Sequence, residues 1–328
     1  MAVADGSVPA RRPARQGTLA RLAEAAVPIR ICILAAFVLL LVFAPVNAAV
    51  LGEFWFFAPI GVFGAIIANA TGTGGGVVFV PIFNAISDGA IELSAAARAV
   101  GNISDSTIAM SFLIQSFGMS MGSTVWLVRL GTGRTVPSDE RCDEPTTLSL
   151  LFTAVVTAVP ALLLTQWFVR LDPATVLTLF KLFSLALGVS LLAVTLKHDR
   201  FAPARHTRMA TRGDLRAVAA IGIVGGVVTA LFSVGVGEFL AVYLILRKYP
   251  IHTAVGLAVI VSALCVLSGV WFHIASGAII YEIVLWTIPG ALLGGAIAGK
   301  VASSLGAQKL KLFASLWIVA SSLYLLLT

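Results

Sequence analysis

Long, largely apolar runs follow one another along almost the whole chain after Arg30. They cover residues 31–51, 54–86, 94–117, 146–168, 174–196, 215–246, 253–274, 279–301 and 308–327. Because a helix needs about 20 apolar residues to cross the hydrocarbon core of a bilayer, these runs leave room for roughly eight to ten spans. The pattern predicts an all-α integral membrane protein, with residues 31–51 as the first transmembrane helix.

Two of the runs, 54–86 and 215–246, are far longer than one helix needs, and each has a glycine-rich segment near its middle. The first segment reads Gly-Thr-Gly-Gly-Gly at residues 72–76, and the second reads Ser-Val-Gly-Val-Gly at residues 233–237. Glycine costs about 1 kcal/mol relative to alanine inside a helix and readily adopts the backbone angles of a sharp turn. Each long run is therefore expected to form two helical arms joined at a bend.

We interpret the two bent runs as the starts of two copies of one unit. The aligned glycine pairs are Gly61/Gly222, Gly64/Gly225, Gly74/Gly235 and Gly76/Gly237. Downstream, Ala-Val-Gly at residues 99–101 recurs at 254–256, and Leu-Thr-Leu-Phe at 177–180 resembles Leu-Lys-Leu-Phe at 310–313. The sequence predicts a first repeat over 54–196 and a second over 215–328, each with one bent element and three transmembrane helices.

Charged residues are scarce and lie mostly outside the apolar runs. They make up 11% of the 328 residues, and hydrophobic residues make up 59%. An ordinary soluble domain carries about a quarter of its residues as charge, so this class is excluded. The 22 Lys and Arg outweigh the 15 Asp and Glu to give a net charge of +7. Their place in short loops indicates membrane topology rather than nucleic-acid binding.

The basic residues also predict the orientation of the chain. The Arg-rich tail, residues 1–30, and the basic linker, residues 197–214, are expected on the cytoplasmic side. The first bend then enters the membrane from outside, the second enters from the cytoplasm, and the C-terminus is outside. Such inverted repeats are typical of secondary transporters. A twin-arginine export signal at Arg11 and Arg12 is the alternative interpretation of the tail, although the apolar run that follows is longer than a signal core.

No motif in the chain predicts an enzyme, a metal site or a cofactor. Cys32, Cys142 and Cys265 are far apart and lack the spacing of metal ligands or of a disulfide framework. The sequence has no GxxxxGK[ST] nucleotide-binding loop and no HExxH metalloprotease motif. No local signature marks a nucleophilic serine. We therefore expect no catalytic residues, no metal and no cofactor.

The glycine bends are the predicted substrate site. Non-helical backbone at membrane depth is tolerated only inside the protein or beside a wet cavity. The arm after each bend starts with free N–H groups and the positive end of a helix dipole, which suit an anion. The predicted substrate-binding residues are Asn69, Thr71, Thr73, Gly74, Gly75, Gly76, Asn102, Ser233, Gly235 and Gly237. The alternative is that the glycines only allow helices to pack closely.

Two acidic residues are candidates for proton coupling. Arg98, Asn102 and Asp105 have the i, i+4, i+7 spacing of one helix face. Arg98 could attract an anion there, and Asp105 is either a proton carrier or a structural partner of Arg98 or of a hydroxyl. Glu238 follows the second bend, where the first repeat has Val77. It either trades a proton with the substrate or caps the helix start itself.

These features together resemble the sulfite exporter family of TauE/SafE type, also called the toluenesulfonate uptake permeases. The resemblance is carried by the two half-chain copies, by Gly-Thr-Gly-Gly-Gly-Val-Val-Phe-Val-Pro at residues 72–81, by the Ala-Val-Gly that follows each bend, and by Pro-Gly-Ala-Leu-Leu-Gly-Gly-Ala-Ile-Ala-Gly at residues 289–299. It extends over nearly all of the chain after about residue 55. The second bend departs from the glycine-rich form at Val236 and Glu238.

The resemblance implies a permease of the bacterial inner membrane that moves sulfite or organosulfonates with an ion gradient. The expected partners are thus a small anionic substrate and the lipid bilayer, with no nucleic acid. The sequence leads us to expect proton coupling and alternating access. A passive anion channel and a non-transporting membrane subunit are the alternative functions.

Overall fold

The computed structural model describes residues 17–132, 142–196 and 209–327, and the regular secondary structure of these residues is all helix, with no strand among them. The helices are α1 (Thr18–Glu24), α2 (Ala26–Phe43), α3 (Ala48–Leu51), η1 (Gly52–Phe54), α4 (Phe57–Thr71), α5 (Gly76–Ser87), α6 (Ala95–Arg98), α7 (Ile103–Thr132), α8 (Glu144–Phe168), α9 (Pro173–Leu196), α10 (Arg212–Phe232), α11 (Val236–Leu246), α12 (Ile251–Ala275), α13 (Tyr281–Leu305) and α14 (Ala307–Leu327). Arg11, Arg12 and most of the predicted linker lie outside the described residues.

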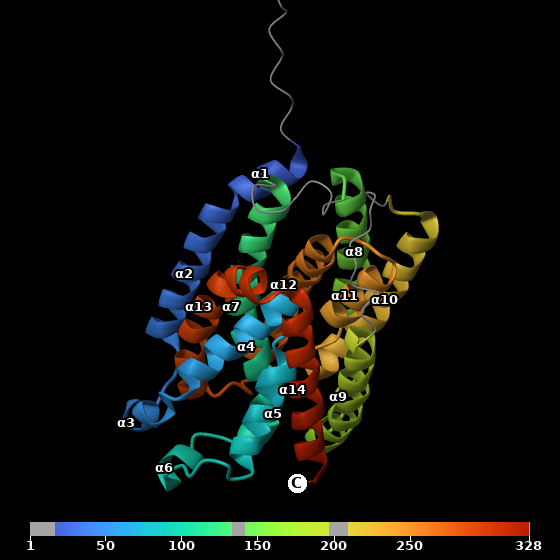
Figure 1. Ribbon diagram of the computed structural model, residues 1–328. Helices are drawn as coiled ribbons and strands as arrows, with labels where there is room; N and C mark the ends of the chain where they lie inside the picture. Colours follow the sequence, from blue (N-terminus) through green and yellow to red (C-terminus); the bar gives the residue numbers. More distant parts are fainter. Residues whose placement is uncertain (1–16, 133–141, 197–208, 328) are drawn as a thin grey trace, which may run out of the picture.

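Eight of the described helices are long and apolar enough to cross a membrane, or up to nine if a bent pair counts as one span. The protein is therefore an all-α multi-pass membrane protein, as the apolar runs predict. The long helices lie beside one another in a bundle, and α1 and the C-terminus lie at opposite ends of it (Figure 1).

Both predicted bends are confirmed. The first interrupts the helix between α4 and α5, where Gly72 has φ +79°, and the second interrupts it between α10 and α11, where Gly235 has φ +144°. Ser233 also has the left-handed conformation, with φ +59°, which is uncommon for a residue with a side chain. In both bends the positive φ ends the first arm and lets the chain turn into the second.

The expected bounds of the first span are wrong at both ends. The helix α2 runs over Ala26–Phe43 rather than residues 31–51, and the part of the predicted tail from Thr18 onward is also helical. Pro28 lies in the first turn of α2, where proline is tolerated because an N–H at this position would have no acceptor within the helix. The helix ends at Phe43 because Pro45 disfavours helical angles at Ala44, which is extended.

The predicted run 94–117 is not one helix. The short helix α6 ends at Arg98, and α7 begins at Ile103 and continues to Thr132. The side chain of Asn102 accepts a hydrogen bond from Ser104 N at 3.0 Å, as residues at helix starts do. Arg98 therefore does not share a helix face with Asp105.

The second bent element begins inside the predicted linker. Thr211 and Asp214 form a reciprocal capping box that starts α10 at Arg212. The carboxylate of Asp214 also accepts hydrogen bonds from Tyr243 and Tyr249 and pairs with Arg247 at 2.9 Å. The start of α10 is thus tied to the end of α11 and to the segment that follows it.

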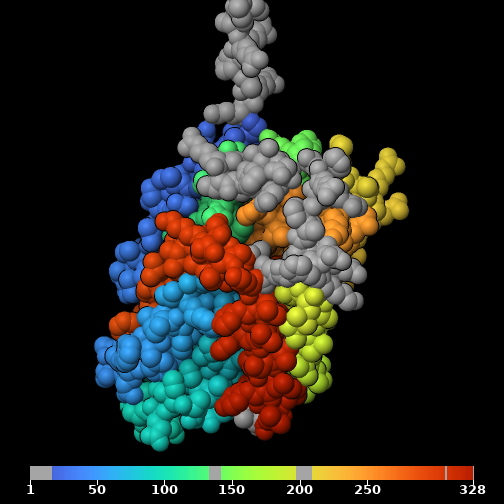
Figure 2. Space-filling view, viewed as in Figure 1, coloured from blue at the N-terminus to red at the C-terminus, as the bar shows by residue number. Residues whose placement is uncertain are grey.

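The two halves of the chain pack on each other by an exchanged pattern. After α4–α5 come α7, α8 and α9, and after α10–α11 come α12, α13 and α14. The helix α4 packs against α13 and α10 packs against α8, while α7 contacts α12 and α9 contacts α14. In Figure 2 the C-terminal helices accordingly lie directly beside α4 and α9 on the same face of the molecule.

One of the repeated glycine pairs, Gly61 and Gly222, serves this packing. A Cβ on Gly61 would strike the carbonyl oxygen of Thr287 in α13, and a Cβ on Gly222 would strike Thr157 in α8. These glycines let helices of opposite halves approach closely, as small residues do in membrane bundles. For this pair, close packing explains the repeat without any ligand.

Candidate functional site

The two bends cross each other in the interior of the protein. A Cβ on Gly76 would lie 2.6 Å from the carbonyl oxygen of Ser233, and a Cβ on Gly237 would lie 2.7 Å from the carbonyl oxygen of Gly72. Each bend thus places a glycine against the backbone of the other, and no larger residue fits at either position. Most of the predicted substrate residues are thereby brought together from two distant parts of the chain.

The Glu238 carboxylate joins the two bends. It accepts a hydrogen bond from Gly74 N at 2.6 Å and another from Gly235 N at 2.8 Å. The side chain is only 1% exposed. Glu238 therefore caps the start of its own helix, which was one of the two alternatives, and it also occupies an N–H of the first bend. Two of the N–H groups expected to bind an anion already donate to a side chain of the protein.

A side chain that the sequence did not single out completes this junction. Gln115 lies in the middle of α7, and its Oε1 accepts a hydrogen bond from Gly75 N at 2.7 Å. Its Nε2 lies 3.0 Å from Ser233 O and 2.7 Å from Ser233 Oγ. An amide in the middle of an apolar span was the available signal, because a buried amide needs partners for both its oxygen and its nitrogen.

The threonines of the first bend lie beside a small cavity. Thr71 Oγ1 and Thr73 Oγ1 are 2.7 Å apart, and Thr71 donates to Ile67 O at 2.7 Å. The cavity has a volume of about 10 Å³, and its polar lining consists of these two threonines, Glu238 and Lys311. The sequence interpretation placed Lys311 in the repeated segment 310–313 and among the basic residues that bear on topology, and it did not identify this residue as part of a site.

Asn69 is buried next to the junction and faces α7. Its Nδ2 donates to Ala65 O at 2.8 Å and to Gly118 O at 3.3 Å, and a Cβ on Gly122 would strike its Oδ1. The Oδ1 atom has no hydrogen-bond partner among the described residues. The side chain fills the contact between α4 and α7.

The other three predicted site residues lie apart from the bends. Asn102 donates to Asp105 at 2.9 Å, and both side chains are exposed. Arg98 is also exposed, and with Asn102 it lines a separate cavity of about 490 Å³. The expected grouping of Arg98 with Asp105 on one helix face is wrong, and the described partner of Asp105 is Asn102.

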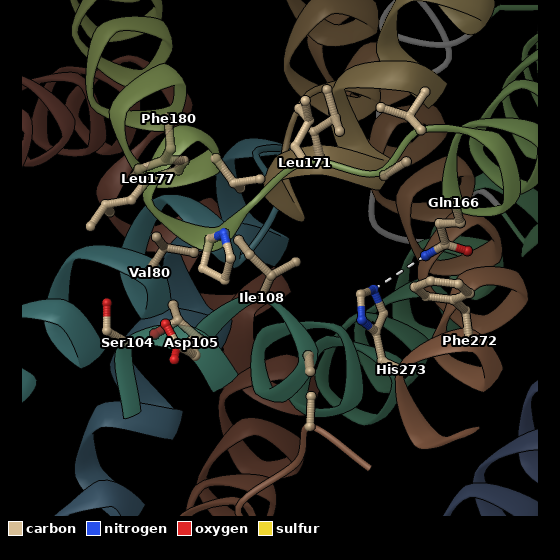
Figure 3. Close-up of a pocket in the computed structure, with 18 of the residues that line it drawn as sticks. Val80, Ser104, Asp105, Ile108, Gln166, Leu171, Leu177, Phe180, Phe272 and His273 are labelled. Atoms are coloured by element: carbon tan, nitrogen blue, oxygen red, sulfur yellow. Dashed lines mark hydrogen bonds between the residues drawn. The ribbon is translucent and has the colours of Figure 1, made fainter. Parts of the chain in front are cut away.

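Asp105 instead lines a third cavity, of about 220 Å³, between α5, α7, α9 and α12. Figure 3 shows Ser104 and Asp105 on one side of this cavity and the pair Gln166–His273 on the other. The Gln166 and His273 nitrogens are 3.2 Å apart, and Ser104 donates to Asn84 at 2.8 Å. The lining also includes Ala230 and Leu231 in the last turn of α10. The cavity therefore extends from the loop between α8 and α9 to the helix that ends at the second bend.

Comparison with known proteins gives one match. A family model described as sulfite exporter TauE/SafE matches residues 140–325, which is more than half of the chain. The matched part includes the second bend with Ser233, Gly235, Gly237 and Glu238, and it ends before the last residues of α14. No curated protein and no solved structure matches the chain.

Proposed function

The chain belongs to the TauE/SafE sulfite exporter family, and from that premise we propose that it is a proton-coupled secondary transporter of small sulfur-containing anions such as sulfite or organosulfonates. The family implies membrane transport of sulfur anions. The eight described helices that are long and apolar enough to cross a membrane fit that role.

The observation that carries the proposal is the Glu238 carboxylate between Gly74 N–H and Gly235 N–H. An anion that binds at these helix starts needs the donors that the carboxylate holds. Protonation removes the charge of Glu238 and weakens its hold on them, because hydrogen bonds to a charged acceptor are about twice as strong as neutral ones. The anion then binds to the protonated protein, and proton and anion cross together.

Asp105 is the proposed second proton carrier. Its exposed carboxylate lines the 220 Å³ cavity that extends toward the second bend. A proton that enters through this cavity meets Asp105 before it reaches Glu238. The Asn102 amide, which donates to Asp105 at 2.9 Å, holds the carboxylate at the cavity lining.

Alternating access follows from the proposed inverted relation of the two repeats. The exchanged packing of α4 on α13 and of α10 on α8 supports this relation, because each repeat holds the other by equivalent helices. A rocking motion of one repeat against the other would expose the crossing of the bends to each side in turn. We place the protein in a bacterial inner membrane with its N-terminus cytoplasmic and its C-terminus outside, which agrees with α1 and the C-terminus at opposite ends (Figure 1).

The test is uptake of radiolabelled sulfite and methanesulfonate into proteoliposomes, with and without an imposed pH gradient. We expect saturable uptake that an inside-alkaline gradient increases. Glu238→Gln should lose the effect of the gradient, while Glu92→Gln, a matched change of an exposed carboxylate, should behave as the wild type.

Two results would contradict the proposal. Uptake that neither saturates nor responds to the gradient would indicate a passive channel. The absence of flux for both anions under every gradient would remove sulfur anions as the substrate class.

A further inference from the structure

Lys311 is a buried basic residue whose role the proposed function does not explain. It lies in α14 with only 7% of its surface exposed, and it makes no ion pair in the described part of the chain. A buried charge without a partner costs several kcal/mol, so proteins retain one mainly where it has a task. Neighbouring Lys309, in contrast, is exposed.

The cavity that Lys311 lines is the one beside the first bend. Thr71 and Thr73 contribute hydroxyls to its wall, and Glu238 contributes the carboxylate side chain. The volume of about 10 Å³ is enough for about one water molecule. An anion of the size of sulfite needs more room than this, and a movement of Glu238 away from the N–H of Gly74 would provide it.

The two charged residues at this cavity, Glu238 and Lys311, have no charged counterparts at the aligned positions of the first repeat. The residue aligned with Glu238 is Val77, and the residue aligned with Lys311 is Thr178. Thr178 is exposed. The second half of the chain thus carries one carboxylate and one ammonium that the first half lacks, and the fold brings the two to the same cavity. Two residues of opposite charge that occur at one cavity, in one repeat only, suit a site in which the ammonium balances a single negative charge.

We propose that Lys311 is the charge partner of the transported anion, and that a monovalent sulfur oxyanion binds beside its ammonium when the Glu238 carboxylate no longer holds the N–H of Gly74. The anion lies between the ammonium and the Thr71 and Thr73 hydroxyls. The identity of the anion as a sulfur compound rests on the proposed function. A single ammonium favours a monoanion, such as hydrogensulfite or a sulfonate, over a dianion such as sulfate.

The test measures anion binding without transport. Thermal unfolding of the purified protein is followed at constant ionic strength in increasing methanesulfonate, hydrogensulfite or sulfate. We expect a saturable rise of Tm with the two monoanions and a smaller one with sulfate. Lys311→Met should lose the rise, and Lys309→Met, the matched change on the same helix, should keep it. A rise in Lys311→Met equal to that of the wild type, or no rise in the wild type, overturns the proposal.

Glu238→Gln keeps the proposal testable if Lys311→Met does not fold. Removal of the competing carboxylate should lower the methanesulfonate concentration at half-maximal Tm shift several-fold. An unchanged or higher concentration overturns the proposal. Flux measured on the same preparations separates the two conclusions, because anion binding that depends on Lys311 without any flux would leave this site standing and remove only the transport function.

Discussion

Glu238 and Gly74 are 164 residues apart in the chain, and a hydrogen bond of 2.6 Å from Gly74 N to the Glu238 carboxylate joins them in the interior. The bond connects the first bend to the second through a group that can gain or lose a proton. Helix starts in most proteins are capped from within their own segment. Here Glu238 caps its own helix and also accepts a hydrogen bond from the first bend, so a change at Glu238 alters the contacts of both halves.

The crossing of the bends predicts that Gly237→Ala is poorly tolerated. The new Cβ would lie 2.7 Å from Gly72 O and would also strike Ser262 Oγ. Overpacking of this kind costs about 1–3 kcal/mol, and it forces the two bends apart. We expect a lower Tm and the loss of transport. Gly52→Ala is the control, because nothing lies within 4 Å of its added Cβ, and equal activity of both variants would contradict the prediction.

Gln115→Met is expected to destabilise the junction while it preserves the volume of the side chain. The change leaves Gly75 N without the acceptor that lies at 2.7 Å and removes the amide nitrogen near Ser233. An unsatisfied buried polar group costs about 1–3 kcal/mol. Thermal unfolding measures the loss. Ser123→Ala on the same helix should change stability by no more than about 0.5 kcal/mol, and a Gln115 variant as stable as that control would refute the role of the amide.

Asp105→Asn is expected to affect coupling more than binding. The residue lines the 220 Å³ cavity and is distant from the crossing of the bends, so its loss should leave the substrate concentration at half-maximal uptake unchanged. The stimulation of uptake by a pH gradient should fall. Asp88→Asn, an exposed carboxylate outside this cavity, provides the comparison. If uptake by the Asp105 variant depended on pH as uptake by the wild type does, Asp105 would be excluded from the proton path.

The thiol of Cys142 should react slowly at neutral pH. Burial raises its pKa from 9.0 to about 11. The folded state thus favours the protonated thiol, and the resulting stabilisation is present below pH 9 and is lost as the pH rises toward 11. Iodoacetamide alkylation at Cys142, measured by peptide mass spectrometry at pH 8, should be much slower in the native protein than after denaturation. Equal rates in the two states would show that the site is not shielded.

The apolar pattern predicted the bends because their cause is local. Runs far longer than one span need a break, and the glycines at 72–76 and 233–237 mark where it falls. The same pattern missed the break between α6 and α7, because alanine, valine and glycine at residues 99–101 are as apolar as a helix interior. Asn102, a favourable residue for a helix start, carried the information that hydropathy does not contain.

The site was only partly predictable for a different reason. The bend residues follow from the repeat, but the partners of their N–H groups come from remote helices, and no local rule pairs Gly75 with Gln115. Lys311 was obscured by its place near a helix start. It shares a helix face with Ala314, Ser315, Ile318 and Ser322, all buried, whereas Lys309 does not. The two serines on this face of an apolar helix were the signal that could have identified it.

The contact of Gly76 with Ser233 O and of Gly237 with Gly72 O also constrains how the protein is made. When only the first half of the chain has been synthesised and inserted into the membrane, Glu238 is not yet present to accept the hydrogen bond from Gly74 N, and the second bend is not yet present to pack against the first. Unpaired backbone groups are costly in lipid. The first bend therefore reaches its final position only after the second half has entered the membrane, so the two halves assemble together rather than one after the other.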